Sequence, residues 1–316
     1  KGQGLEKLFR LTIQLENGGI NCNAEFEVLE NSPAAALVDG HKGFGYVVAK
    51  KGTALAVEKA AKVGIGMVSI KHSNHFGQAG YHAESITKSG MIGYVMTNAK
   101  AEMAPWGATE PVLATNPWGI GIPREGADPI LLDMALTQSG QGMVMWAFRE
   151  GQDVPDNWML TADGAKSTNP ADFLNADGSE STGTQYPIGE FKGYGLALFC
   201  ELLGGLLSGG GTIQPEHQRQ NSIINNMFTL LIDPARLVDV PWMQHEVEAI
   251  VAYAKASPPA NPEEPVLIAG DPERNSKKER QRQGIPIDDA TWEQILEGGE
   301  TLGLTRDEML NNLQNS

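Results

Sequence analysis

The chain has 316 residues, of which 41% are hydrophobic and 20% are charged, a composition that is ordinary for a globular protein and excludes extended disorder. Its 24 basic and 39 acidic side chains give a net charge of −15, which argues against nucleic acid and anionic membranes as partners. The two cysteines, Cys22 and Cys200, predict neither a disulfide framework nor a thiolate metal site. With no apolar run of about 20 residues and no visible secretory leader, we expect a cytoplasmic location.

Helices and strands alternate in the first half of the chain. Residues 54–63 are strong helix formers and stop at Gly64, which is typical of a helix C-terminus. The strands are separated by helices of about ten residues, a spacing that predicts βαβ units. We therefore expect an α/β fold with a mixed, largely parallel sheet and flanking helices. The expected helices are 54–63, 80–89 and 141–149, and the expected strands are 66–70, 92–97, 119–122 and 130–134.

The second half of the chain is less regular. Residues 151–190 are rich in Gly, Asp, Asn, Ser, Thr and Pro and show little periodicity, so we expect a functional loop or lid there. Residues 257–265 contain four prolines and predict a spacer. The remaining expected elements are helices at 192–207, 242–256 and 272–283, a helix capped by Asp288 and Asp289, and strands at 227–232 and 266–269.

The densest polar cluster is the segment from Lys71 to Tyr81, which contains His72 and His75. It follows a predicted strand and precedes a predicted helix, and ligands of parallel α/β sheets bind outside the carboxyl ends of the strands. A neutral imidazole suits acid–base chemistry near pH 7, and Asn74 could orient it. The alternative is a polar loop whose histidines cap the helix or face water. Position and density favour the functional interpretation.

A metal site is a further alternative at the same segment. His72, His75 and His82 could supply three nitrogens. However, the sequence has no HExxH motif, and no carboxylate has the spacing that would complete a zinc-hydrolase set. We therefore expect no metal.

Two other segments could hold phosphate. The strand that ends near Asp133 runs into Thr137 and Ser139 before a helix, so free backbone N–H groups and hydroxyls could bind a diphosphate, although an ordinary helix cap has the same pattern. Lys192 follows Gly189 at a helix start and could meet a phosphate or carboxylate. The chain contains no Walker or Rossmann fingerprint, so any dinucleotide site is of another kind.

Several motifs occur in a fixed order along essentially the whole chain. They are Asn17-Gly18-Gly19-Ile20, Val38-Asp39-Gly40, Ser73-Asn74-His75-Phe76-Gly77, Thr115-Asn116-Pro117, Leu132-Asp133-Met134-Ala135, Lys192-Gly193-Tyr194-Gly195 and the tail Glu279 to Pro286. Together they resemble the malate/L-lactate dehydrogenase family that is unrelated to the Rossmann-type lactate and malate dehydrogenases. The closest resemblance is to its hydroxycarboxylate dehydrogenase B branch, because of Leu203-Gly204-Gly205 and the charged tail.

The resemblance implies a non-Rossmann α/β sheet and an NADH- or NADPH-dependent reductase of 2-oxo acids that works reversibly on 2-hydroxy acids. It also implies a dimer or higher oligomer, and we expect a homodimer. We expect residues 1–50 and 235–316 to form a helical, dimerising part and residues 51–234 to form the cofactor-binding α/β domain. Lys7 and Arg10 are candidates for binding the substrate carboxylate. The implied cofactor contacts are Gly77, Gln78, Ala79, Asp133, Met134, Ala135, Leu136, Thr137, Phe191, Lys192, Asn225, Gly270, Asp271 and Pro272.

The chain departs from the family at the expected proton donor. The family has Ser-His-Gly near its N-terminus, and ungapped counting back from Asn17 places these positions at Gly2, Gln3 and Gly4. A glutamine amide cannot exchange a proton near neutral pH. Three explanations are open: the first residues are not the native ones, His75 has taken over the role, or the chain binds a dinucleotide without turnover. Gln3 and His75 are therefore the catalytic candidates.

Overall fold

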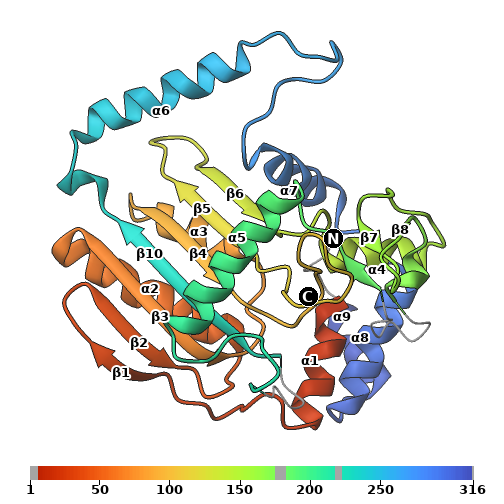
Figure 1. Ribbon diagram of the computed structural model, residues 1–316. Helices are drawn as coiled ribbons and strands as arrows, with labels where there is room; N and C mark the ends of the chain where they lie inside the picture. Colours follow the sequence, from red (N-terminus) through yellow and green to blue (C-terminus); the bar gives the residue numbers. More distant parts are fainter. Residues whose placement is uncertain (1–5, 175–182, 218–222, 315–316) are drawn as a thin grey trace.

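The computed structural model describes residues 6–174, 183–217 and 223–314. A seven-stranded sheet crosses the molecule in the order β1-β2-β3-β10-β4-β5-β6 (Figure 1). Met227 and Leu231 of β10 are fully buried, which places this strand at the centre of the core. The strands are β1 (Glu27–Asn31), β2 (Ala35–Asp39), β3 (Ile65–Ser73), β4 (Ile92–Thr97), β5 (Trp118–Ile122), β6 (Ile130–Met134) and β10 (Asn225–Ile232).

The mixed α/β class with flanking helices is confirmed, but the expectation of a largely parallel sheet is wrong. Among the described strands of this sheet, only β2 and β3 pair in parallel, and all other neighbours pair antiparallel. The cause is β10, which enters between β3 and β4 and is antiparallel to both. β3 and β4 do share a direction, as the βαβ spacing predicts, but a strand from far downstream separates them.

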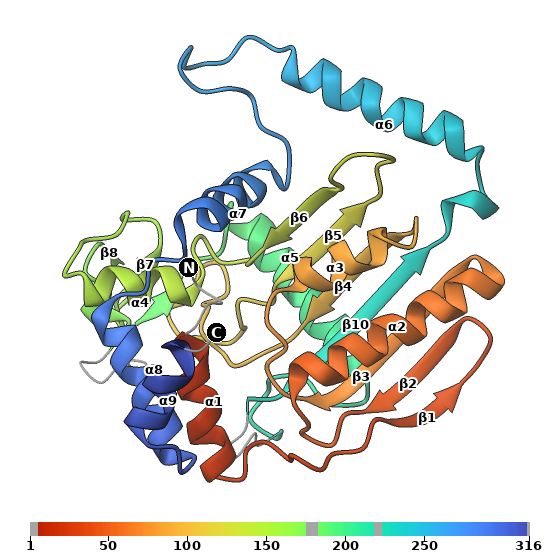
Figure 2. The ribbon, with the colours of Figure 1, turned by 180° about the vertical axis from the view of Figure 1, so that it is seen from behind.

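Helices cover both faces of the sheet. α2 (Gly45–Val63) and α3 (Ala79–Thr87) lie on one face and α5 (Phe191–Glu201) lies on the other, as Figures 1 and 2 show. α2 ends at Gly64 as expected but begins at Gly45, well before the expected start. A Cβ at Gly45 would lie 2.2 Å from the carbonyl oxygens of Asn74 and His75, so glycine is needed where α2 meets the loop after β3.

α3 approaches β5 closely because β5 carries two glycines. A Cβ at Gly119 would lie 2.6 Å from the carbonyl carbon of Ala79, and a Cβ at Gly121 would lie 2.7 Å from the carbonyl oxygen of Ala83. The close contact between α3 and β5 fixes the position of the first turn of α3 on the sheet.

The segment expected to be a loop, residues 151–190, contains short regular elements. β7 (Met159–Leu160) pairs with both β8 (Lys166–Ser167) and β9 (Thr184–Gln185), and η1 (Pro170–Asp172) follows β8. Together with α4 (Gln141–Arg149) they enclose a separate apolar cluster. This cluster explains why the segment folds despite its weak periodicity.

The expected helix at 192–207 is α5 followed by a π-helical turn, η2 (Leu202–Leu206). The expected strand at 266–269 is wrong. These residues form no strand; Val266 and Leu267 instead line a pocket against α7 (Asp271–Gln283).

The remaining helices lie around the sheet. α1 (Glu6–Glu16) packs against α8 (Asp289–Thr301), which is followed by α9 (Arg306–Gln314). After η3 (Pro234–Arg236), α6 (Val240–Lys255) extends along one edge and stands away from the sheet (Figure 1). No helix among the described residues combines the length and apolarity needed to cross a membrane. β1 and β2 fall within residues 1–50 yet belong to the main sheet, and the expected division into two parts stays a prediction.

We expect Gly119→Ala to lower the free energy of unfolding by about 1–3 kcal/mol, because the added methyl group would overlap the α3 backbone. Gly195→Ala is the matched control. A Cβ at Gly195, within α5, would meet open space, so this change should be neutral or stabilise by up to about 1 kcal/mol. Urea unfolding followed by circular dichroism measures both variants. Equal stabilities would contradict the close packing.

Candidate active site

Hydrogen bonds hold the loop that follows β3 against α1. Asn74 Nδ2 donates to Gln14 Oε1 at 2.9 Å and to the carbonyl oxygen of Gly19 at 3.3 Å. Asn74 Oδ1 accepts the N–H of His75 at 2.7 Å. Gln14 Oε1 also accepts the N–H of Ile223 at 3.1 Å. One buried amide pair thus joins α1, the β3 loop and the segment that precedes β10.

His75 carries a buried ring nitrogen. Its Nε2 is enclosed and has no hydrogen-bond partner among the residues that the structure describes. The ring meets Tyr46 edge-on, with centroids 6.0 Å apart. Burial, followed by the positive charges of Lys7 and Arg10, lowers the pKa of His75 to about 4. The ring is therefore neutral at pH 7, and it lies in the field of the two predicted carboxylate-binding residues.

Arg10 reaches from α1 toward α4. Its Nη1 donates to Gln141 Oε1 at 3.2 Å, and its Nη2 lies 3.9 Å from Met145 Sδ. The guanidinium is thus held from two sides while its charge still acts on His75. The third N-terminal candidate, Gln3, lies outside the described residues.

Three of the implied cofactor segments meet at Asp133, at the end of β6. A Cβ at Gly80 would lie 2.5 Å from Asp133 Cβ, and the Gly80 N–H donates to the Asp133 carboxylate. Burial raises the pKa of Asp133; the Gly80 bond opposes this rise, and the charge of Glu273 on α7 adds to it. Gly77, Gln78 and Ala79 immediately precede Gly80, while Gly270 to Pro272 begin the helix that carries Glu273.

The segment after β6 is tied to the start of α5. The N–H of Ile188 donates to the carbonyl oxygen of Leu136 at 3.0 Å, and Thr137 pairs with Pro187. Phe191 and Lys192 then stand exposed at the first turn of α5. Leu136 itself is fully buried, and its N–H donates to Thr115, so it has no polar group left for a ligand.

Asn225 lies apart from Asp133, at the other end of the described site. It pairs with Ser73 at the end of β3 and donates to the carbonyl oxygen of Asn98 at 2.8 Å. Asn225 therefore lies with the His75 loop. The other cofactor candidates lie around Asp133 and α5.

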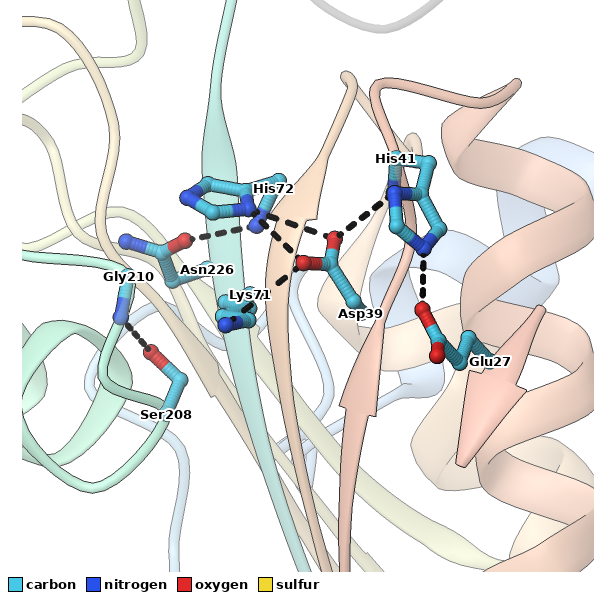
Figure 3. Close-up of polar contacts among 8 residues, drawn as sticks. All are labelled: Glu27, Asp39, His41, Lys71, His72, Ser208, Gly210 and Asn226. Atoms are coloured by element: carbon cyan, nitrogen blue, oxygen red, sulfur yellow. Dashed lines mark hydrogen bonds and ion pairs between the residues drawn. The ribbon is translucent and has the colours of Figure 1, made fainter. Parts of the chain in front are cut away.

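A second polar cluster, which we did not predict, surrounds Asp39 at the carboxyl ends of β2 and β3 (Figure 3). His72 Nδ1 lies 3.2 Å from both carboxylate oxygens, and Lys71 Nζ lies 3.5 Å from Oδ2. Burial would raise the pKa of Asp39, but the N–H of His41 and the interaction with His72 lower it overall. His72 therefore has its own acidic partner, and His82 meets the carbonyl oxygen of Phe76 instead, so the three histidines considered for a metal have separate surroundings.

Glu201 is another buried acid that we did not predict. Its carboxylate accepts Asn98 Nδ2 at 2.8 Å, Asn116 Nδ2 at 3.1 Å and the N–H of Ile213 at 2.7 Å. The signal in the sequence was an acid at the end of an otherwise apolar helix. Because such a group needs donors when buried, Glu201 could have been paired in advance with the Asn116 motif.

Comparisons with known proteins agree with the motifs. Residues 1–296 match the family described as malate/L-lactate dehydrogenase. The chain is 33% identical over 291 residues to hydroxycarboxylate dehydrogenase B of Escherichia coli K12, covering 91% of this chain and 79% of that protein. It is 34% identical over 289 residues to L-sulfolactate dehydrogenase of Methanothermobacter thermautotrophicus, covering 89% and 80%. It superimposes on the structure of a candidate malate/lactate dehydrogenase from E. coli with a TM-score of 0.92 and 31% identity, covering 99% of this chain and 87% of that one.

We expect Lys7→Gln to raise the pKa of His75 from about 4 toward its usual 6.5, because one of the two charges that disfavour the imidazolium is removed. NMR titration of the His75 ring measures the change. Since the folded pKa lies below the unfolded one, the wild type should lose stability as the pH falls from 6.5 to about 4, and Lys7→Gln should lose less. Lys88→Gln, a surface change at the C-cap of α3, should leave the His75 titration as it was; a pKa of His75 unmoved by Lys7→Gln would refute the assignment.

Proposed function

We propose a reaction for this chain, which belongs to the malate/L-lactate dehydrogenase family. The chain reduces a 2-oxo acid to the 2-hydroxy acid with NADH or NADPH, and it also catalyses the reverse reaction. The observation that carries the proposal is the buried Nε2 of His75, which has no hydrogen-bond partner among the described residues and lies in the field of Lys7 and Arg10. A small 2-oxo acid has a carboxylate for the two cations and a carbonyl oxygen for the ring nitrogen.

The described residues fit a nicotinamide dinucleotide at the segments around Asp133 and α5. Gly77 has a φ of 84°, a conformation that suits glycine, and it lies directly before α3. Gln78, the N-cap of α3, makes no side-chain capping bond within the described residues, so backbone N–H groups at the start of this helix can meet a phosphate. Lys192 is exposed and can meet a phosphate as a point charge. When bound, the cofactor would supply or accept the hydride. Leu136 fits poorly as a contact because it is fully buried and its backbone groups are bonded within the fold.

His75 is proposed to hold the proton at Nε2. In the oxidation of a hydroxy acid the neutral ring accepts the hydroxyl proton, and in the reduction the protonated ring returns it to the alkoxide oxygen. The positive charges of Lys7 and Arg10 disfavour the protonated form of the His75 ring. A substrate carboxylate bound between them would offset both charges and so raise the pKa of His75 at the moment when the proton is needed.

The pH dependence tests this role. For hydroxy acid oxidation, kcat/KM should rise with increasing pH, with a midpoint near the His75 pKa of about 4 in the free enzyme. The acidic limb of the kcat profile should lie at higher pH, because the bound substrate carboxylate raises the pKa of His75. His75→Ala should lower kcat by about 100-fold or more and remove the limb, with little effect on dinucleotide binding. An unchanged kcat would end the proposed role of His75.

A second function is a catalytically silent NAD(P)-binding protein. It is favoured by Gln3 at the position where the family has its histidine. This alternative predicts saturable quenching of reduced-nicotinamide fluorescence without oxidation of the cofactor by pyruvate, oxaloacetate, hydroxypyruvate or phenylpyruvate. Turnover of any of these would reject it, and Gln3→His should create activity if it holds.

We further propose that the chain is a homodimer and that it works in the cytoplasm. Several apolar side chains of α5, η2 and α6 are exposed: Phe199 by 65%, Leu206 by 66%, Ile250 by 58% and Tyr253 by 77%. Large exposed apolar side chains on these elements favour contact with another protein.

Light scattering after size exclusion measures the assembly. The wild type should have twice the mass of the chain, and Phe199→Ser should weaken the dimer. Val63→Ser changes a similarly exposed apolar residue at the end of α2, on the opposite face of the sheet, and should not affect the assembly. A monomeric wild type would contradict the proposal.

A further inference from the structure

A pocket of about 520 Å³ lies between the end of α6, the proline-rich spacer and the first turns of α7. Its volume falls in the range of ligand sites, about 300–1,000 Å³. One part of its lining is apolar and comes from the spacer and the residues after it, including Pro259, Pro265 and Leu267. The other part is polar and comes largely from α7, including Asp271, Asn275 and Lys278.

The pocket adjoins the segments proposed for the dinucleotide. Asp271 lies in its lining and directly follows Gly270. The carbonyl oxygen of Ala269 accepts the N–H of Leu131 at 3.1 Å, and Leu131 is two positions before Asp133 on β6. A ligand that runs along Asp133 can therefore continue into this pocket.

The acidic side chain of the pocket is already occupied. Asp271 Oδ1 accepts Arg274 Nη2 at 2.9 Å, while Oδ2 accepts the N–H of Ile268 at 3.1 Å and lies 2.8 Å from Lys255 Nζ. A carboxylate that recognises an unphosphorylated ribose must accept from its 2′-hydroxyl. Asp271 instead has both oxygens bonded and its charge offset by two cations, so it is poorly placed to accept from a ribose.

Lys278 is the available cation of the pocket. It is exposed, and within the described residues it has no acidic side chain at ion-pair distance. Asp271, Asn275 and Lys278 follow the i, i+4, i+7 spacing that puts them on one face of α7. The helix sequence DPERNSKKERQRQ holds five basic and three acidic residues, so an anion is attracted here although the whole chain is acidic.

We propose that this pocket binds the adenosine end of NADPH and that Lys278 recognises its 2′-phosphate, which makes NADPH the preferred cofactor. The proposal rests on the proposed dehydrogenase function and deepens it by naming the cofactor. The apolar lining offers a surface for the adenine ring. A phosphate monoester carries a charge of about −1.5 to −2 at neutral pH, which suits an unpaired ammonium group and a neighbouring amide donor from Asn275.

Calorimetry with two fragments tests the pocket without turnover. The whole chain should bind 2′,5′-ADP at least about tenfold more tightly than 5′-AMP, because only the first carries the 2′-phosphate. Lys278→Gln should reduce this ratio to about threefold or less. Lys277→Gln is the matched control: it removes the same charge from the adjacent exposed position of α7, outside the pocket lining, and should keep the ratio.

Equal affinity of the wild type for the two fragments, or no binding of either, would overturn the proposal. An equal loss with Lys277→Gln and Lys278→Gln would also overturn it, because the effect would then be one of general charge. Oxidation of NADH by a 2-oxo acid, measured on the same wild-type preparation, separates this failure from failure of the dehydrogenase function. Thermal unfolding of both variants should match the wild type, since both lysines are exposed.

Discussion

The position of β10 between β3 and β4 is the constraint on which the candidate active site depends. Its first residue, Asn225, pairs with Ser73, the last residue of β3, so the centre of the sheet fixes where the His75 loop leaves it. Gln14 then binds both that loop and Ile223, just before β10. The fully buried side chains of Met227 and Leu231 anchor β10 in the core. The His75 loop, α1 and β10 are therefore held together by these contacts. The charges of Lys7 and Arg10 on α1 act on His75 because the pairing of the sheet fixes where α1 and the loop meet.

Positive charge lies beside a candidate ligand site in two places of this acidic chain. Lys7 and Arg10 act on the buried ring of His75, while Lys278 of α7 lines the pocket beside the spacer. Burial makes the first pair effective at short range, because little water screens it. The surrounding negative charge disfavours anions elsewhere on the surface. An anionic substrate and an anionic cofactor are thus attracted by different, local groups of basic residues.

Local patterns were sufficient for some elements and insufficient for others. α4 and β4 follow from short-range periodicity and lie where the sequence predicts them. The direction of strand pairing does not follow from local patterns, because β10, the strand that pairs with β3, comes from far downstream. Polar density pointed to His75, whereas the contact of Asp39 with His72 spans 33 positions and left no local signal. Lys7 and Arg10 were named only through the family resemblance, since the bond that brings α1 to the loop spans 60 positions.

The way in which α6 is held has a consequence for how the molecule responds to its medium. Arg124 binds Glu248 through two hydrogen bonds of 2.7 Å near the middle of α6, and Lys255 binds Asp271 at its C-terminal end. Both contacts include a partly exposed partner, so added salt weakens them. Rising ionic strength therefore weakens the contacts that hold α6 and also the attraction of Lys278 for anions. Salt acts at the same time on the Lys255–Asp271 pair and on Lys278, and all three residues line one pocket.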